Sequence, residues 1–457
     1  MSTQPQLYNR TTAVAVVVAN MIGTGVFTSL AYQLIGLSDP FAIIMLWLAG
    51  GIIALCGAFC YAEVATRLKE SGGEYLYLSK IFHPVVGFTS SWISLFAGFS
   101  GAIATSALAI GKYAGPVLGY TVDTNDTSLF RIDKLVAIGA LIFLSLIHVR
   151  GVKTGGLAQT ILTSIKLALI AFFCLAPFFI SGSNQGIQSF APSNKSWELI
   201  FSMAFAGSLA WVMFSYSGWN AASYIAGNIE KPRKTIPQAL ILGTLFVTFI
   251  YIFLNMMFLY TTPMDEMNFV KNGFKEDVGN IVATKLFGVD YGLIFSGLFS
   301  LALLSTCSSM IIAGPRVLEK MGHDYSFFKS LTVNSKGGTP VIAIVVQGVL
   351  SLSMILFSDF ESMIQYISII LTFFSVLTVI GLIVLRIKSK GQPDDPSVYK
   401  SPLFPIPALI FIAAAVWMIL FFATHEDPKE RMKLVYGALS LLPGIILYYI
   451  TVALKKR

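Results

Sequence analysis

The chain has 457 residues, of which 55% are hydrophobic and 12% charged, and its formal net charge is +8. Soluble globular proteins carry charge on about a quarter of their residues, so this composition excludes an ordinary soluble fold and predicts a polytopic membrane protein. The cysteines all fall in apolar segments and the four histidines are scattered: Cys56, Cys60, Cys174 and Cys307; His83, His148, His323 and His425. We therefore expect no disulfide framework, no metal site, no cofactor and no binding of nucleic acid.

The hydropathy pattern predicts an all-α protein with about twelve transmembrane helices. A span needs about 20 apolar residues, and only an α-helix satisfies its backbone hydrogen bonds over that length in hydrocarbon. We expect a single transmembrane domain over residues 1–457, because no connection is long enough to hold a soluble domain. The expected spans, in chain order, are 11–34, 41–66, 84–118, 132–149, 153–181, 199–226, 236–260, 291–315, 340–358, 361–387, 404–423 and 434–454.

The distribution of charge predicts the topology. With an even number of spans both termini lie on one side of the membrane. If that side is the cytoplasm, lysine and arginine prevail in the inner connections and aspartate and glutamate in the outer ones, as the positive-inside rule requires. We therefore expect a multi-pass protein of the plasma (inner) membrane with cytoplasmic termini.

Two of the expected spans contain sequences that break helices. Residues 20–27 read NMIGTGVF, in which Gly23 and Gly25 each weaken a helix by about 1 kcal/mol relative to alanine. Residues 215–220 read SYSGWN and interrupt the sixth span in the same way. Glycines also serve as close-packing residues in membrane helices, which is the alternative interpretation of this pattern.

The two interrupted spans open two blocks of five helices. The first block covers about 11–181, the second about 199–387, and two additional helices follow over 404–454. Because five is odd, the second block has inverted topology. Paired breaks at equivalent positions of inverted repeats are the best sequence indication of a transporter site.

An unwound stretch in the middle of a membrane frees backbone N–H and C=O groups, which persist there only if they face a cavity that something polar fills. The helix that starts near Gly25 directs its positive N-terminal end at this cavity, which suits an anion. The carbonyl end of the preceding half-helix suits a cation. Because a zwitterion needs both, the breaks predict a site for an α-amino acid.

The motif NMIGTGVF resembles the first helix of the amino acid–polyamine–organocation superfamily of permeases, in particular its L-type amino acid transporter branch. Further resemblances follow in the same order along nearly the whole chain. They are GAFCYAEVATRLKESGGEYLYLSKIF (57–82), GVKTGGLAQTILTSIKL (151–167), FSYSGWNAASYIAGNIEKPRKTIPQAL (214–240) and GPRVLEKMGHD (314–324).

This resemblance implies a leucine-transporter-like fold with a 5+5 inverted repeat in which helices 1 and 6 are interrupted. It also implies which residues hold the substrate. The backbone of the first break would bind the carboxylate and amine, and carbonyls of the second would share the ammonium. Phe214 would cover the substrate as a gate, and Asn220 would either meet the substrate side chain or steady the unwound stretch. The expected substrate-binding residues are Met21, Gly23, Thr24, Gly25, Phe214, Ser215, Ser217 and Asn220. Ser217 replaces a glycine of many relatives and would narrow the pocket.

Residues for coupling or gating are expected on the fifth, seventh and eighth spans. By the resemblance, Lys153 approaches the place between the first and eighth helices where sodium-coupled relatives hold an ion, and its ammonium would replace the charge of that ion. A lysine that only snorkels to the interface is the alternative. The accompanying candidates are Ser305, Ser308 and Ser309 on one face of the eighth span, with Tyr251 and Asn255 on the seventh.

Two further ionisable residues lie in the expected spans. Glu63 is expected to pair with Arg67 one turn later, in a structural role. Lys166 lies 13 residues beyond Lys153, roughly 20 Å further along the helix, and the sequence assigns it no role.

The sequence therefore predicts a transporter that moves neutral L-amino acids by alternating access, as an exchanger, with a proton-coupled symporter as the alternative. A channel and an intramembrane serine protease are the competing classes. The protease hypothesis rests on GFSG (98–101), with Ser100 as nucleophile, but the only histidine in a span, His148, is expected at a different depth. We therefore expect that the protein is not an enzyme.

The sequence also bears on partners. The loop 119–133 contains no cysteine, so no disulfide-linked subunit is expected.

Overall fold

The structure, a computed structural model, describes residues 7–120, 128–129, 131–180, 185–187, 189–268, 278–357, 360–391, 395–424 and 427–455. Within these ranges the chain is helical and forms no β-strand. The longer helices are α1 (Arg10–Met21), α2 (Gly25–Gly36), α3 (Pro40–Leu68), α4 (Gly73–Ile81), α5 (Pro84–Ile93), α6 (Ala102–Leu118), α7 (Ile132–Val149), α8 (Val152–Leu175), α10 (Met203–Tyr216), α12 (Pro232–Thr261), α15 (Val278–Phe287), α16 (Val289–Asp324), α17 (Val341–Phe357), α18 (Phe360–Lys388), α19 (Ile406–Thr424) and α20 (Pro428–Lys455). Shorter elements are a π-helix (Ser94–Gly101), 3₁₀ turns (Ala176–Phe178, Ala226–Asn228 and Ser326–Thr332), α9 (Asn194–Ile200), α11 (Ala221–Tyr224) and α13 (Met264–Met267).

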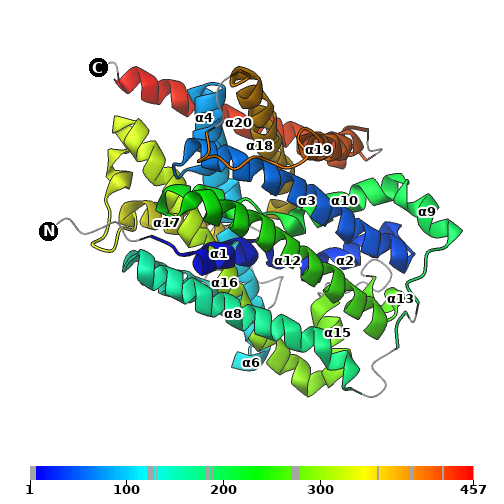
Figure 1. The fold of residues 1–457 in the computed structure, drawn as a ribbon. Helices are drawn as coiled ribbons and strands as arrows, with labels where there is room; N and C mark the ends of the chain where they lie inside the picture. The colour runs from blue at the N-terminus through cyan, green and yellow to red at the C-terminus, as the bar shows by residue number, and fades with distance from the viewer. Residues whose placement is uncertain are drawn as a thin grey trace.

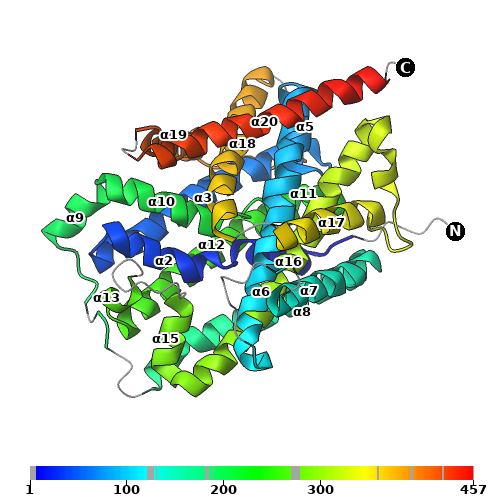
Figure 2. The ribbon, with the colours of Figure 1, turned by 180° about the vertical axis from the view of Figure 1, so that it is seen from behind.

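The helices agree with the expected number of membrane spans. In the described part of the chain, ten spans are long and apolar enough to cross a bilayer, and α9 with α10 forms an eleventh that is bent by 66°. Helix α17 matches the expected span 340–358 with 17 residues, or about 26 Å. The start of α1 and the end of α20 lie on the same side of the bundle, as an even number of spans requires (Figures 1 and 2).

The first break lies where the sequence predicts it. Helix α1 ends at Met21 and α2 begins at Gly25, with residues 22–24 in a bend. The backbone leaves the helical region at Ile22, whose ψ angle is 89°. The two halves therefore form one span with a gap in its middle.

The second break lies at residues 217–220, between α10 and the short α11. Gly218 has a φ angle of +95°, a conformation open to glycine and costly for other residues. The bend between α9 and α10 was not predicted. Ser193 and Ser202 accept hydrogen bonds from backbone N–H groups at the starts of these two helices, which makes each of them a separate helix.

The expected span 84–118 is not one regular helix. Helix α5 widens into the π-helix Ser94–Gly101 before it continues as α6. An apolar run does not reveal this change, because hydropathy is the same for both helix types. Such widened turns occur frequently at functional sites.

The broken helices lie in the core of the bundle. Helix α1 packs against α12, α8 and α16, while α10 packs against α2 and α3. The last two long helices, α19 and α20, run along the outside beside α18 (Figures 1 and 2). The gap in α1 is therefore surrounded by protein and not by lipid.

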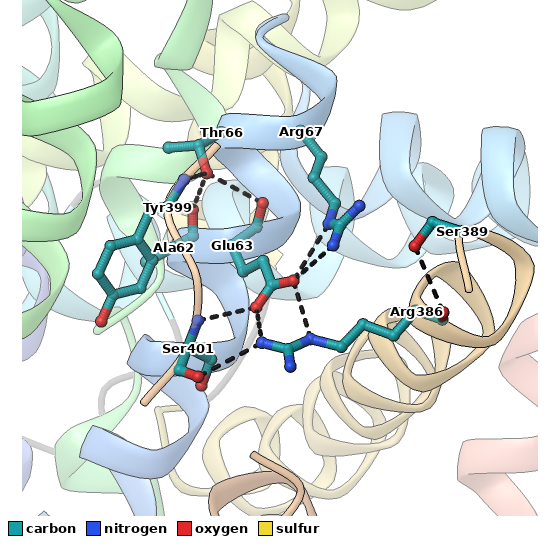
Figure 3. A network of polar contacts seen from close by, with 8 residues as sticks. All are labelled: Ala62, Glu63, Thr66, Arg67, Arg386, Ser389, Tyr399 and Ser401. Atoms are coloured by element: carbon teal, nitrogen blue, oxygen red, sulfur yellow. Dashed lines mark hydrogen bonds and ion pairs between the residues drawn. The ribbon is translucent and has the colours of Figure 1, made fainter. Parts of the chain in front are cut away.

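A buried ion-pair network fastens α3 to α18 and to the segment that follows it (Figure 3). The Glu63 carboxylate, which is fully buried, accepts hydrogen bonds from Arg67 at 2.9 Å and from Arg386 at 2.5 Å. It also accepts one from the backbone N–H of Ser401 at 2.8 Å. The predicted pair with Arg67 is present, and Arg386 and Ser401 extend it across 338 residues of chain.

Glu63→Gln is expected to lower the free energy of unfolding by about 2 kcal/mol. Breaking a buried pair costs about 3–5 kcal/mol, and here water reduces that loss because the arginine side chains keep 23% and 26% of their exposure. The thermal midpoint of the purified variant in detergent measures the effect. Glu70→Gln is the control, because the Glu70 side chain is 42% exposed and its pairs are worth little. Equal midpoints for both variants would contradict the structural role.

Candidate functional site

A cavity of about 140 Å³ lies where the two broken helices meet. Its wall combines backbone of both breaks with side chains of the π-helix, α6, α16 and α18. All eight residues predicted to bind substrate line this one cavity: Met21, Gly23, Thr24, Gly25, Phe214, Ser215, Ser217 and Asn220. The fold thus brings the two predicted segments together, which their spacing in the sequence did not guarantee.

The break in α1 presents opposite ends of two helices to the cavity. The first N–H groups of a helix have no partner inside it, and the residue before α2, Thr24, makes no side-chain cap. These N–H groups form the positive end of a helix dipole, which attracts a carboxylate. The carbonyls of residues 19–22 form the negative end of α1. A molecule with one charge of each sign matches this arrangement.

The two breaks touch each other at two glycines. A β-carbon on Gly25 would lie 2.8 Å from Ser215 Oγ and 3.0 Å from Ser215 Cα. A β-carbon on Gly218 would lie 2.8 Å from the carbonyl carbon of Asn20. By contrast, a β-carbon on Gly23 would meet only Thr306, at 3.8 Å. The close approach of the two breaks therefore leaves no room for a side chain at Gly25 or Gly218, whereas there is room for one at Gly23.

Tyr251 of α12 joins the two breaks from outside the cavity. Its buried hydroxyl oxygen lies 2.5 Å from the carbonyl oxygen of Met21 and 2.8 Å from that of Ser215. The single hydroxyl proton is therefore shared between the two carbonyls in a bifurcated hydrogen bond. The other candidate on α12, Asn255, donates to the Tyr251 carbonyl one turn earlier in the same helix. Tyr251 thus links the predicted binding segments, whereas Asn255 supports its own helix.

Tyr251→Phe is expected to lower the transport rate about tenfold. The variant keeps the ring but removes the donor of the Ser215 carbonyl and leaves the Met21 carbonyl with the Gly23 N–H alone, which costs about 1–3 kcal/mol. Initial uptake rates into proteoliposomes measure the loss, and Tyr449→Phe is the control because that side chain is 60% exposed. An unchanged rate in Tyr251→Phe would refute a role for this hydroxyl.

The lysine near the break is Lys166, and the sequence-based placement of Lys153 is wrong. Lys153 lies in the first turn of α8 with an exposed side chain. Lys166 is buried, and its ammonium donates to Ile22 O at 2.5 Å and to Thr306 Oγ1 of α16 at 2.8 Å. Ala19 O lies 3.4 Å away. The ammonium therefore lies between the first and eighth spans, at the negative end of α1.

The three candidate serines of α16 are buried but do not surround this ammonium. Ser305 contacts Gln159 and Thr163 of α8, Ser308 lies 2.8 Å from the ring of His148, and Ser309 donates to a carbonyl of its own helix. Thr306, one residue after Ser305, makes the contact that we expected from the serines. Helical spacing thus predicted the correct turn of α16, but not that Thr306 is the residue of this turn that faces Lys166.

The geometry gives no support to a protease dyad. His148 Nε2 bonds with Ser308 Oγ, and the Ser100 hydroxyl has no partner among the described residues. The Ser100 carbonyl accepts a hydrogen bond from Ser351 of α17. Ser100 is therefore a buried packing residue of the π-helix and has no base beside it.

Glu74 is the only charged side chain that lines the cavity in the described part of the chain, and it was not among the residues predicted from the sequence. It lies in the second residue of α4, a helix in the connection between α3 and α5, and is 1% exposed. It was not considered as a site residue because it lies in a connection between two predicted spans. A signal was available, because Glu74 follows a pair of glycines, Gly72 and Gly73, both with positive φ angles that let the chain turn back toward the core.

Comparison with known proteins extends these findings. Residues 8–442 match the family model "Amino acid permease". The chain is 28% identical to the serine/threonine exchanger SteT of Bacillus subtilis, over 97% of this chain and 96% of that protein. It is 26% identical to the mouse b(0,+)-type amino acid transporter 1, over 97% and 87%. It is 29% identical to the mouse large neutral amino acids transporter small subunit 2, over 96% and 80%.

The family and these relatives are transporters and not enzymes, which confirms the predicted absence of enzymatic function. The predicted resemblance and the fold class are confirmed as well, since the match covers nearly the whole chain and the helical architecture fits. This chain is a multi-pass membrane protein that belongs to the amino acid permease family of the amino acid–polyamine–organocation superfamily.

Proposed function

We propose that this protein exchanges neutral L-amino acids across a plasma membrane by alternating access. The observation that carries the proposal is the meeting of two broken helices around one cavity. The N-terminal end of α2 supplies a site for a carboxylate, and the carbonyls at the end of α10 supply a site for an ammonium, the two charges that every α-amino acid carries. Apart from Glu74, the residues that line the cavity have no charged side chain, which favours a neutral substrate side chain.

Lys166 supports exchange without a cotransported metal cation. Its ammonium is tethered to α8 and already lies at the negative end of α1, where a dissociable cation would otherwise be needed. A transporter without a coupled ion takes its driving force from the gradient of a second substrate. The name of the Bacillus subtilis relative, a serine/threonine exchanger, agrees with this mode.

The experiment is uptake of labelled neutral amino acids into proteoliposomes with and without unlabelled amino acid inside. An exchanger gives uptake that requires internal substrate. Uptake that needs no internal substrate but follows an imposed pH gradient would replace exchange by proton symport. No uptake of any amino acid would reject both, and conductance without saturation would indicate a channel.

We further propose a plasma-membrane location with both termini in the cytoplasm and no disulfide-linked subunit. The excess of lysine and arginine in the connections on the side of the termini supports the orientation. All four cysteines (Cys56, Cys60, Cys174 and Cys307) are buried and unpaired, so none is available to a partner. Non-reducing electrophoresis of the protein from its native membrane tests this, and a larger species that collapses on reduction would contradict it.

A further inference from the structure

Glu74 forms one polar end of the cavity together with residues of three other elements. The Asn220 side chain of the second break donates to Glu74 Oε1 at 3.2 Å, and Ser375 Oγ of α18 donates to the same oxygen at 2.9 Å. The Tyr61 hydroxyl of α3 is a third donor to Oε1. Glu74, Asn220 and Ser375 all line the cavity. The carboxyl group is therefore held in place from several directions.

The second oxygen of this carboxyl group is unused. Glu74 Oε2 is buried and has no hydrogen-bond partner among the described residues. The Tyr224 hydroxyl, which accepts from Asn220 at 3.3 Å, lies beside the carboxyl group and keeps its proton free to donate toward it. A buried polar atom without a partner costs about 1–3 kcal/mol, so the empty site is incomplete at this position.

Among the described residues, no lysine, arginine or histidine pairs with this carboxyl group. The titratable side chains that face it are the phenols of Tyr61, Tyr77 and Tyr224. Burial raises the pKa of Glu74 above its usual value, while hydrogen bonds from the surrounding side chains, the hydroxyl of Tyr224 included, oppose that shift. Oε2 therefore presents a lone pair or, when protonated, an O–H group.

We infer that Glu74 Oε2 is the side-chain subsite of the substrate and that it selects small amino acids with a hydroxyl group. This inference rests on the proposed function and names the substrate class of the same cavity. A hydroxyl group both donates and accepts, so it satisfies Oε2 in either protonation state. A methyl group of the same size leaves Oε2 without a partner.

The size of the cavity and the neutral donors around Glu74 favour the same class. The Ser217 β-carbon and the aromatic side chains of Phe99, Phe214 and Tyr224 bound a cavity of about 140 Å³. A site built to bind a substrate hydroxyl rejects the isosteric analogue strongly, because a buried polar group is then left unpaired. Threonine and valine, and likewise serine and alanine, are the pairs that differ by this one group.

The experiment compares these pairs in the full-length protein in proteoliposomes. We expect labelled substrate uptake to be inhibited by threonine at a concentration at least about tenfold lower than by valine, with the same order for serine and alanine. Glu74→Met should reduce both ratios to less than about threefold, since the thioether has a similar length but offers the substrate hydroxyl no comparable hydrogen-bond partner. Glu70→Gln, an exposed carboxyl four residues earlier, should keep the wild-type ratios.

Each outcome decides the inference separately from the proposed function. Equal inhibition by threonine and valine in the wild-type protein overturns it even if Glu74→Met fails to fold. Preference for lysine or arginine over both pairs also overturns it, because Oε2 would then pair with a cation. Wild-type discrimination that survives in a folded Glu74→Met variant overturns it as well and assigns the selectivity to another residue. If the wild-type protein takes up no amino acid, the proposed function fails first.

Discussion

Gly218→Ala is expected to reduce amino acid uptake to less than a tenth of the wild-type rate. The alanine would have to adopt a φ angle near +95°, and its β-carbon would lie 2.8 Å from the Asn20 carbonyl carbon and 2.9 Å from its oxygen. Backbone strain of this kind costs about 1–3 kcal/mol, and the clash adds a displacement of the first break relative to the second. The first and second breaks, which together bind the substrate, are therefore pushed apart.

The control for this variant is Gly139→Ala. Gly139 lies in α7, its β-carbon would have no atom within 4 Å, and alanine is the better helix former. We expect wild-type uptake and an equal or higher thermal midpoint. Initial uptake rates, corrected for the amount of protein reconstituted, measure both variants. Wild-type uptake in Gly218→Ala would show that the close contact between the breaks is not needed for transport.

Lys166→Met is expected to have an effect of similar size. Methionine fills the space of the lysine stem but removes the ammonium that binds Ile22 O and Thr306 Oγ1. The negative end of α1 then faces a buried space without its cation, and hydrogen bonds to charged groups are worth about 1.5–3 kcal/mol each. We expect uptake below a tenth of the wild-type rate because the backbone of the first break is then no longer held in the conformation that binds substrate.

Lys153→Met is the matched control, with the same chemical change in the same helix. The Lys153 side chain is exposed, so uptake should stay within about twofold of the wild-type rate, as for other surface substitutions. The result distinguishes the structural assignment from the one that the sequence resemblance favoured. Loss of uptake in Lys153→Met with retention in Lys166→Met would restore the earlier assignment.

The membrane spans and both breaks could be predicted from the sequence because they depend on local properties. Long apolar runs give spans, and glycine within such a run weakens the helix at that place. Gly23, Gly25 and Gly218 marked the breaks without knowledge of their neighbours. The structure adds that of these three only Gly25 and Gly218 are tightly enclosed, which follows from the packing of α2 on α10 and of the second break on α1, and not from either span alone.

The side chains around the breaks could not be predicted equally well, because they depend on how helices face each other. Lys153 and Lys166 lie in the same helix, and their order along it was known, but the sequence does not tell which of them reaches α1. Glu74 was missed for a similar reason. Glu74 lies in a short helix outside the predicted membrane spans. It reaches the core only because α4 folds back against α3 and α18.

The central claim is that the ends of the broken helices bind both charges of one zwitterion. Competition with three compounds that share one propyl chain tests it most directly: 2-aminobutyrate has both groups, butyrate lacks the ammonium, and propylamine lacks the carboxylate. We predict that 2-aminobutyrate inhibits uptake of a labelled amino acid, and that neither single-charge compound matches its inhibition at a tenfold higher concentration, since each lost charged contact costs about 1.5–3 kcal/mol, which is more than tenfold in affinity. Inhibition by butyrate or propylamine at the same concentration as 2-aminobutyrate would contradict the account.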